Sequence, residues 1–455
     1  MAGVVRPDSK VLGVVVLVRH GDRSSFYQNA ADYTPANTII TPLGNVQEYL
    51  LGQNLRSIYL TSNSSSFIST INSDVVDHDQ ILVRADGGGE GGVIFNSAVS
   101  LLQGLFPPTL NYDMTLANGT TIVGPMGGYQ SVPIESVEPD NDISLEGWTD
   151  CNAFSKATKA FYNSDVFKAK ASENTDFLQS LRPYLDDRPI TFENMWNIFD
   201  YMNVQSLHNK TFLDSLPPTY LAQARHLANF HQYGVFSSVQ PNGIGNIAGQ
   251  TTLPSILEGV QRIGSSSDPL NFVYQAVSYK PFISLFNITQ AAEMNPELAG
   301  IVNYAAAMVF EVRESDSGGE PVIRFNFKNG TEDSFRTYNF MSSTDDIPLS
   351  TFVNTLEPFG FDDLPTWCNV CGNTEDRGCA ELVAAASRAS QAARLESKPA
   401  ISAVGAGFIG AGVTIVVLFA MLGVFTFLGL LTVGFGKRKA KRGKYGYDTD
   451  STEKS

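Results

Sequence analysis

An unbroken apolar run near the start of the chain, residues 11–18, constrains the fold more than any other part of the sequence. It reads Val-Leu-Gly-Val-Val-Val-Leu-Val, without one polar side chain. A strand that is apolar on both faces is typical of the centre of a parallel sheet with helices on either side. Helical patterns over 42–58 and 95–105 alternate with a second strand pattern over 80–84. This alternation predicts an α/β fold, a mostly parallel sheet flanked by helices.

The region of about 125–240 differs from this alternation. It is acidic at first and then helical in pattern, without strong strands, so it predicts an inserted, mainly α-helical subdomain. Strand patterns return at 307–313 and 322–327. We therefore expect one large domain over 1–379, followed by an Ala-rich helical stalk over 380–400.

The C-terminal part contains a long uncharged segment. No Asp, Glu, Lys or Arg occurs from Pro399 to Gly436, and about 20 apolar residues suffice to cross a bilayer. A buried core helix is the alternative, but such helices rarely stay apolar on every face for this length. The sequence predicts one transmembrane helix within 401–436, with the lipid bilayer as a partner. The basic cluster Lys437–Lys444 that follows predicts a cytosolic tail over 437–455 and an extracellular or lumenal domain.

The net charge of −15 is the sum of two opposite parts. The last nineteen residues hold seven Lys/Arg and three Asp/Glu, so the tail carries +4 and the remainder −19. An acidic domain of this size is not a nucleic-acid binder by bulk charge. Aromatic residues make up 11% of the chain, which excludes a disordered chain. Neither number indicates an oligomeric state.

The compartment of the domain is less clear from the sequence. The first ten residues contain no apolar signal-peptide region, so a signal lies upstream, export uses another route, or the domain is cytosolic and tail-anchored. Four cysteines favour two disulfides of open connectivity, and zinc is disfavoured because no His lies near their one close pair. Five glycosylation sequons permit, without requiring, a glycoprotein. The cysteines and sequons are Cys151, Cys368, Cys371 and Cys379, and Asn63, Asn118, Asn209, Asn287 and Asn329.

The chemistry of the chain is concentrated where the first strand ends. Residues 19–23 read Arg-His-Gly-Asp-Arg, and ligands of open α/β sheets bind beyond the carboxyl ends of strands. Arginine forks bind phosphate oxygens in pairs. A neutral imidazole held between two arginines can attack phosphorus and form a covalent intermediate. The alternative is a surface salt-bridge cluster, but the complete string at a strand end favours a phosphate site built from Arg19, His20 and Arg23.

This segment also resembles a known family. Val18–Ser24 is similar to the signature of the histidine acid phosphatases, the phytase and prostatic/lysosomal acid phosphatase branch of the phosphoglycerate-mutase-like superfamily. The resemblance continues through Thr41–Gly44 and Val83–Arg84 to the segment Trp367–Cys379. It covers about Val11 to Cys379, and the C-terminal anchor is most similar to membrane-bound fungal members.

The resemblance implies a phosphoric monoester hydrolase that acts through a phosphohistidine. His20 would be the nucleophile, Arg19, Arg23 and Arg84 would bind the phosphate, and Asp22 would be structural. A phosphorylated small molecule or a phosphoprotein would be the substrate. This mechanism needs no metal and no cofactor.

Two departures from the family pattern surround the expected phosphate site. Ser25 stands where the family usually has proline, and Arg84 is followed by Ala85 and a glycine-rich stretch, 86–92, in place of an Arg-Ser-Thr string. Backbone N–H groups of such a stretch can form an anion nest. The stretch lacks the Gly-Lys-Ser/Thr of a nucleotide-binding loop, so it does not indicate nucleotide binding.

The proton donor of the family is also missing. Its His-Asp pair should fall within 278–290, where the chain has neither His nor acid. Asp345 is a competing candidate, disfavoured because it follows the late strands. His226 and His231 lie on an amphipathic helix, where we expect them to be satisfied structurally. A general acid contributes about 10²–10⁴-fold to the rate.

The sequence therefore leaves two hypotheses. The first is a membrane-anchored phosphomonoesterase with a nonstandard proton donor. The second is a catalytically degenerate ectodomain that binds phosphate or a phosphorylated ligand as a receptor or scaffold. Retention of Arg19, His20, Arg23 and Arg84 favours the enzyme, because positive charge concentrated in an acidic domain is difficult to explain without an anion to bind. The missing His-Asp pair favours the second hypothesis.

Overall fold

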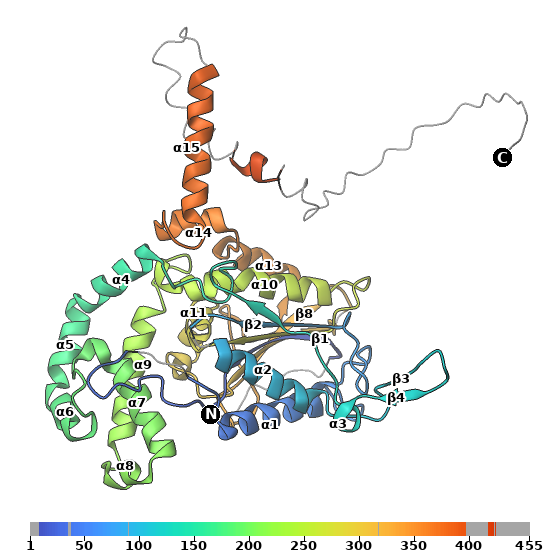
Figure 1. Ribbon diagram of the computed structural model, residues 1–455, viewed down its shortest axis with the longest axis horizontal. Coiled ribbons are helices and arrows are strands. Elements are labelled where there is room, and N and C mark those ends of the chain that lie inside the picture. The colour runs from blue at the N-terminus through green and yellow to red at the C-terminus, as the bar shows by residue number, and fades with distance from the viewer. Residues whose placement is uncertain are drawn as a thin grey trace, which may run out of the picture. The chain divides into compact units, whose positions relative to one another are not determined.

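A computed structural model describes residues 9–34, 38–89, 91–316, 318–396, 417–422 and 424 of the 455 (Figure 1). The chain divides into two compact units, 1–380 and 381–455. In the first unit, helices cover both faces of a central sheet. The predicted α/β class is confirmed in this form.

The central sheet is half parallel and half antiparallel. Its strand order is β10-β8-β7-β1-β6-β2-β5, and β9 pairs with β8. The neighbours β1, β6, β2 and β5 are parallel, whereas β7 runs antiparallel to both β1 and β8. The expectation of a mostly parallel sheet therefore holds for one half only. The strands are β1 (Val11–Arg19), β2 (Ile81–Asp86), β5 (Glu135–Val137), β6 (Phe272–Val277), β7 (Ala307–Arg313), β8 (Val322–Lys328), β9 (Arg336–Thr337) and β10 (Ile347–Pro348), with a separate hairpin of β3 (Asp113–Thr115) and β4 (Thr121–Val123).

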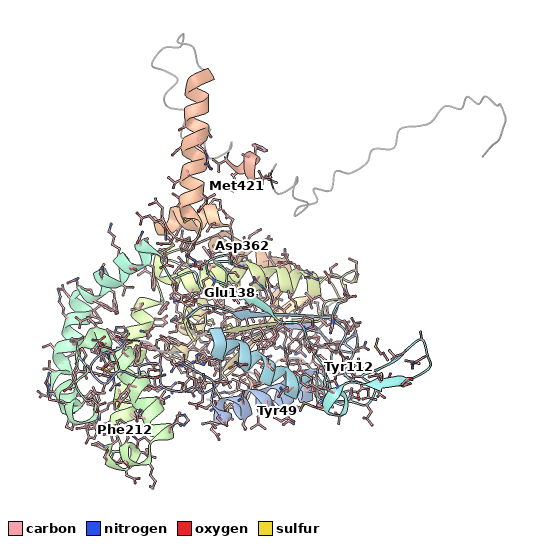
Figure 2. The ribbon with its side chains drawn as sticks, in the orientation of Figure 1. Tyr49, Tyr112, Glu138, Phe212, Asp362 and Met421 are labelled. Carbon is pink, nitrogen blue, oxygen red and sulfur yellow. A yellow bond between two sulfur atoms is a disulfide. The ribbon has the colours of Figure 1, made fainter. Side chains whose placement is uncertain are left out.

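The apolar run of β1 is explained by the two layers of helices around it. Val14 and Val16 pack into the core beneath α1 (Pro42–Tyr59) and α2 (Gly91–Leu105). Val15 and Leu17 point to the opposite face and pack into the core shared with α10 (Ile247–Ile263) and α11 (Lys280–Ile288). Figure 2 marks Tyr49 on the α1 side of the sheet and Asp362 on the α10 side. Both faces of β1 are thus withdrawn from water, as the run predicts.

Strand β6 was not predicted, although it lies between β1 and β2 at the centre of the sheet. All six of its residues are buried. A short apolar run of this kind cannot be distinguished from a helix segment by periodicity. Its consequence for the site is large, because its carboxyl end brings Ser278 beside the end of β1.

The inserted region is mainly helical but not free of strands. Strand β5 lies within it and extends the parallel half of the sheet, so this region also contributes one short edge strand. The other helices of the chain are α3 (Pro125–Gly128), α4 (Asn152–Tyr162), α5 (Asp165–Glu173), α6 (Thr175–Ser180), α7 (Met195–His208), α8 (Lys210–Ser215), α9 (Tyr220–Val235), α12 (Ala291–Met294), α13 (Leu349–Leu356), α14 (Leu364–Cys371) and α15 (Cys379–Glu396).

Two disulfides are present, as the cysteine count predicted. They join Cys151 to Cys371 and Cys368 to Cys379, so zinc is excluded at these four positions. Within the described ranges, no helix combines the length and the apolar character that a membrane crossing requires. Most of the predicted membrane segment 401–436, and all of the predicted tail 437–455, lie outside the described residues.

Candidate active site

The Arg-His-Gly-Asp-Arg segment is held between β6 and α2 at the carboxyl end of β1. The backbone N–H of His20 donates to the carbonyl of Val277, the last residue of β6, at 3.2 Å. The N–H of Gly21 donates to the hydroxyl of Ser97 on α2 at 3.1 Å. His20 is fully buried. The backbone that carries the imidazole is therefore fixed on two sides.

The environment of the His20 ring determines which nitrogen can act as a nucleophile. Nδ1 lies 2.8 Å from the carbonyl oxygen of Gly21. Because a carbonyl oxygen can only accept, Nδ1 carries the hydrogen, and in the neutral ring the lone pair is on Nε2. An imidazole in this tautomer is suited to nucleophilic attack through Nε2.

Arg19 is held beside His20 by aromatic rings. Its guanidinium lies 4.4 Å from the ring centroid of Tyr304 and 5.3 Å from that of Tyr279, and it donates to the carbonyl of Val302. The Tyr304 ring lies 5.6 Å from the His20 ring. Burial raises the pKa of Tyr304 to about 12, so its hydroxyl stays protonated at physiological pH. These contacts restrict the guanidinium to the neighbourhood of the imidazole.

Arg23 and Asp22 connect the same loop to α7. The guanidinium of Arg23 is paired with the carboxylate of Asp200, with Nη2 2.9 Å from Oδ1. The Asp22 carboxylate accepts from the Thr41 hydroxyl and lies 2.7 Å from Nε2 of His208. Asp22 thus bridges the loop to the start of α1 and the end of α7, which is a structural position.

A third guanidinium, which is partly buried, lies near Arg19. Arg225 on α9 donates to the carbonyl of Ile301 at 3.0 Å and to the side chain of Asn303. Burial, and then the charge of Arg19, lowers the pKa of Arg225. In the sequence, only His226 and His231 stood out on this helix. Arg225 was not identified, because no local pattern indicates that helix packing brings it to the end of β1.

A cavity of about 320 Å³ opens at the carboxyl ends of β2 and β6. Arg19 and Arg23 do not line it, but each lies against a ring that does: the Arg19 guanidinium is 5.3 Å from the Tyr279 ring and the Arg23 guanidinium is 5.1 Å from the Phe26 ring. Six of the lining residues are aromatic. The lining consists of Phe26, Tyr27, Asp86, Gly89, Ile94, Glu146, Trp148, Thr149, Trp196, Gln232, Phe236, Ser278, Tyr279 and Lys280.

Arg84, which we expected to bind the phosphate, does not lie with Arg19, His20 and Arg23. It lies beside Gln275 in the sheet, level with Leu17, and therefore three positions before His20. Its guanidinium bonds to Glu135 at 2.8 Å and to Asp142 at 2.6 Å. It lines a separate cavity of about 560 Å³ on the α10 side of the sheet. Two acidic partners already compensate its charge there.

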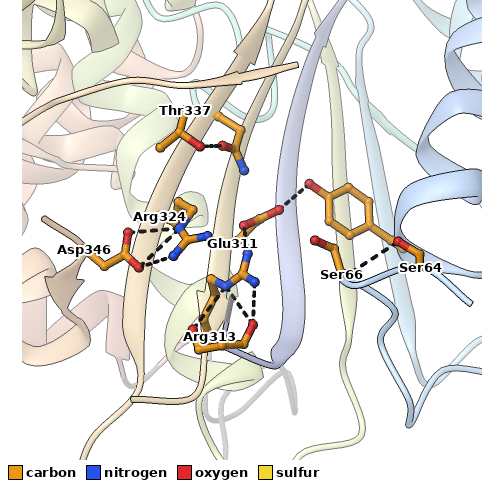
Figure 3. Close-up of polar contacts among 10 residues, drawn as sticks. Ser64, Ser66, Glu311, Arg313, Arg324, Thr337 and Asp346 are labelled. Carbon is orange, nitrogen blue, oxygen red and sulfur yellow. Dashed lines mark hydrogen bonds and ion pairs between the residues drawn. The ribbon is translucent and has the colours of Figure 1, made fainter. Parts of the chain in front are cut away.

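Asp345, the candidate proton donor, does not lie beside His20. It is exposed and immediately precedes Asp346, which pairs with Arg324 at 2.7 Å (Figure 3). Strand β10 pairs with Ile323 on β8. Ile323 in turn pairs with Val312 on β7, and Val312 pairs with the beginning of β1. Asp345 therefore lies at the end of the sheet opposite His20.

The two histidines of α9 do not replace the missing acid either. His231 is buried, with Nε2 3.0 Å from the carbonyl of Glu193, and Nδ1 accepts from the Gln232 amide at 2.9 Å. His226 is exposed. Neither lines the cavity. The residues at the end of β6, where the family pair was sought, are Val277 and Ser278, and the buried Ser278 hydroxyl has no hydrogen-bond partner within the described chain.

The carboxyl groups that line the cavity, Asp86 and Glu146, were not identified as site residues from the sequence. Across the parts of the chain that the structure describes, no three His, Cys, Asp or Glu side chains are arranged to hold a metal ion.

Comparison with known proteins finds similarity to phosphatases. No family model matches the chain. The lysosomal acid phosphatase of Homo sapiens is 22% identical over 378 residues, covering 80% of this chain and 81% of that protein, and that of Pongo abelii is 23% identical with the same coverage. Among solved structures, the phytase from Citrobacter braakii has a TM-score of 0.54 at 13% identity, covering 80% of this chain and 99% of that one. The Hafnia alvei phytase in complex with tartrate has a TM-score of 0.52 at 13% identity, covering 81% and 99%. At these identities the two phytase structures show a common fold.

Proposed function

We propose that the chain is a member of the histidine acid phosphatase family, a phosphoric monoester hydrolase that acts through a phosphohistidine on His20. The observation that carries the proposal is the hydrogen bond from Nδ1 of His20 to the Gly21 carbonyl, which leaves the Nε2 lone pair for phosphorus. Arg19 and Arg23 lie on either side of this histidine in the chain, and each contacts an aromatic residue that lines the neighbouring cavity.

The proposed reaction has two steps. In the first, Nε2 of His20 forms a bond to phosphorus while the bond to the ester oxygen breaks, and the leaving oxygen receives a proton. In the second, water attacks the phosphohistidine, phosphate leaves, and His20 is restored. Arg19 and Arg23 stabilise the charge that develops on the phosphoryl oxygens.

The cavity favours a small substrate with a single phosphate. Its volume is at the lower end of the ~300–1,000 Å³ typical of ligand sites. Of the described residues that line it, only Lys280 is cationic, whereas Asp86 and Glu146 are acidic. A polyphosphorylated substrate would meet these carboxylates with like charge. Six aromatic side chains suit an apolar or aromatic ester group.

The test uses the full-length protein, purified in mild detergent, with phenyl phosphate from pH 4 to 7. We expect turnover that falls at least a thousandfold in His20→Ala and is unchanged in His226→Ala, which alters an exposed histidine. Rapid quenching should also trap acid-labile phosphate on the parent protein and none on His20→Ala. Equal, negligible rates for the parent and His20→Ala would contradict the proposal.

The second candidate function is a phospho-ligand-binding ectodomain without turnover. Two observations favour it. Val277 and Ser278 stand where the family acid was expected, and the Arg23 guanidinium is already paired with Asp200. Calorimetry with inorganic phosphate separates the two candidates. Binding that is lost in Arg19→Ala, in a protein without His20-dependent hydrolysis, would support this second function.

We also propose that residues 401–436 anchor the protein in a membrane, with the tail cytosolic. The length of the uncharged segment and the basic cluster after it support this topology. The two disulfides, which persist in oxidising compartments, support an extracellular or lumenal domain. Protease treatment of intact vesicles should remove a C-terminal epitope and spare the domain. Cleavage of the domain in intact vesicles would contradict this orientation.

A further inference from the structure

We infer that Glu146 is the general acid that protonates the leaving group, in place of the missing His-Asp pair. This inference rests on the proposed hydrolase function. It concerns a side chain that lies 126 positions after His20 and outside every segment with a catalytic pattern.

Glu146 is a buried carboxyl group on the cavity wall, and one of its two oxygens has no hydrogen-bond partner among the described residues. It is 8% exposed and lines the cavity beside the His20 loop. Its Oε1 accepts a hydrogen bond from the Thr149 hydroxyl at 2.8 Å. Its Oε2 is buried and has no hydrogen-bond partner among the described residues. Because a buried polar atom without a partner is costly, an oxygen in this state points to a group that the ligand supplies.

The cavity that Glu146 lines adjoins the His20 loop. Its wall includes Ser278, which directly follows Val277, whose carbonyl accepts from the His20 N–H. In an in-line displacement the leaving oxygen points away from the nucleophile, and we place it in this cavity. The candidates to protonate it are then the two carboxyl groups on the cavity wall, Asp86 and Glu146.

Of these two acids, Asp86 is committed to the backbone. It is the last residue of β2, and its Oδ1 accepts from the N–H of Gly88 at 2.9 Å. This bond shapes the turn that leaves the strand. Glu146 has no comparable backbone contact through Oε2, so it is the better candidate for proton transfer.

The glycine-rich stretch after β2 makes room for the Glu146 carboxyl group. A Cβ atom on Gly88 would lie 1.4 Å from Oε2, so an added methyl group would force the carboxyl group to move. Nothing lies within 4 Å of the corresponding position on Gly89. Of these two glycines, only Gly88 is covered by the Glu146 carboxyl group and leaves no room for a side chain.

The proton balance closes over the two steps. As the bond from phosphorus to the ester oxygen breaks, protonated Glu146 gives its hydrogen to that oxygen, and the alcohol leaves. The resulting carboxylate then takes a proton from the water that attacks the phosphohistidine. Phosphate, neutral His20 and protonated Glu146 are restored.

The test compares two leaving groups in Glu146→Gln. Glycerol 2-phosphate releases an alkoxide that needs protonation, whereas p-nitrophenyl phosphate releases a stable phenolate. We expect kcat/KM to fall about 10²–10⁴-fold on the first and less than tenfold on the second. Glu135→Gln, which alters an exposed carboxylate outside the cavity, should change neither rate.

Equal losses on both substrates, or no loss on either, would overturn the assignment to Glu146. A selective loss in Asp86→Asn but not in Glu146→Gln would transfer the role to Asp86 and likewise overturn it. Gly88→Ala provides a second route if Glu146→Gln folds poorly. It should reproduce the selective loss because the new methyl group displaces the carboxyl group, while Gly89→Ala should behave as the parent. Hydrolysis that is independent of His20 would instead contradict the proposed function itself.

Discussion

Arg23 and Asp200 form a buried, two-point ion pair that joins the loop after β1 to helix α7. Nη2 lies 2.9 Å from Oδ1 and Nη1 lies 3.3 Å from Oδ2, and neither side chain is more than 5% exposed. The two residues are 177 positions apart in the chain. This ion pair therefore connects the helical insertion directly to the loop that carries the proposed nucleophile, His20.

Removal of one partner from this pair should strongly destabilise the protein. Asp200→Ala leaves the Arg23 charge buried and uncompensated, and we expect the free energy of unfolding to fall by about 3–5 kcal/mol. Asp214→Ala is the matched control, because its pair with Lys210 is exposed and should contribute less than about 1 kcal/mol. Urea unfolding measures both. Similar losses in the two variants would mean that burial of the Arg23 pair has no special effect.

Glu48 should make the fold more stable in acid than at neutral pH. It is fully buried on α1, neither carboxyl oxygen has a hydrogen-bond partner within the described chain, and burial raises its pKa well above the usual value. Because the unfolded chain releases this proton first, stability is complete below the ordinary glutamate pKa. It falls as pH rises toward the folded pKa, by up to about 1.4 kcal/mol per pH unit.

Glu48→Gln removes this titration. Thermal unfolding between pH 4 and 7.5 should show a smaller decline in Tm with rising pH for the variant than for the parent. Glu258→Gln, which alters a side chain that is 69% exposed, should leave the slope unchanged. A parallel decline in parent and Glu48→Gln would contradict the prediction.

His231 should act in the opposite direction. Burial lowers its pKa to about 4, and its two hydrogen bonds, to the Glu193 carbonyl and from the Gln232 amide, fit the neutral ring. The stability that it contributes is present above the ordinary histidine pKa. It is lost as pH falls toward 4, up to about 3 kcal/mol in total. His231→Gln should unfold with less acid sensitivity than the parent, and His226→Gln should match the parent.

The two disulfides should differ in their contribution to stability. Cys151 and Cys371 are 220 positions apart, whereas Cys368 and Cys379 are 11 apart. In the chain-entropy account the longer loop contributes more, about 5 against about 3 kcal/mol. Paired serine substitutions at each bridge, compared by urea unfolding, should show the larger loss for Cys151 and Cys371. Equal losses would argue against this account for the present chain.

The local sequence pattern was sufficient to predict strands that are recognisable from the residue types within their own segment. The run at 11–18 was predictable as a buried strand because every side chain in it is apolar, and the pair β7 and β8 because short alternating runs flank a turn. The residue types of 19–23 indicated a phosphate site through their own chemistry. Four cysteines indicated two disulfides, but not which partners they join.

Long-range pairing governed the remainder of the site. Strand register and the face of each strand place Arg84 in another cavity and Asp345 at the far end of the sheet, since a strand exposes alternate residues to opposite faces. Helix packing brings Asp200 to Arg23, and loops after β2 and β5 bring Gly88 and Glu146 together. Contacts between residues distant in sequence depend on how the whole core packs. The hydrophobic periodicity of a single segment therefore cannot predict them.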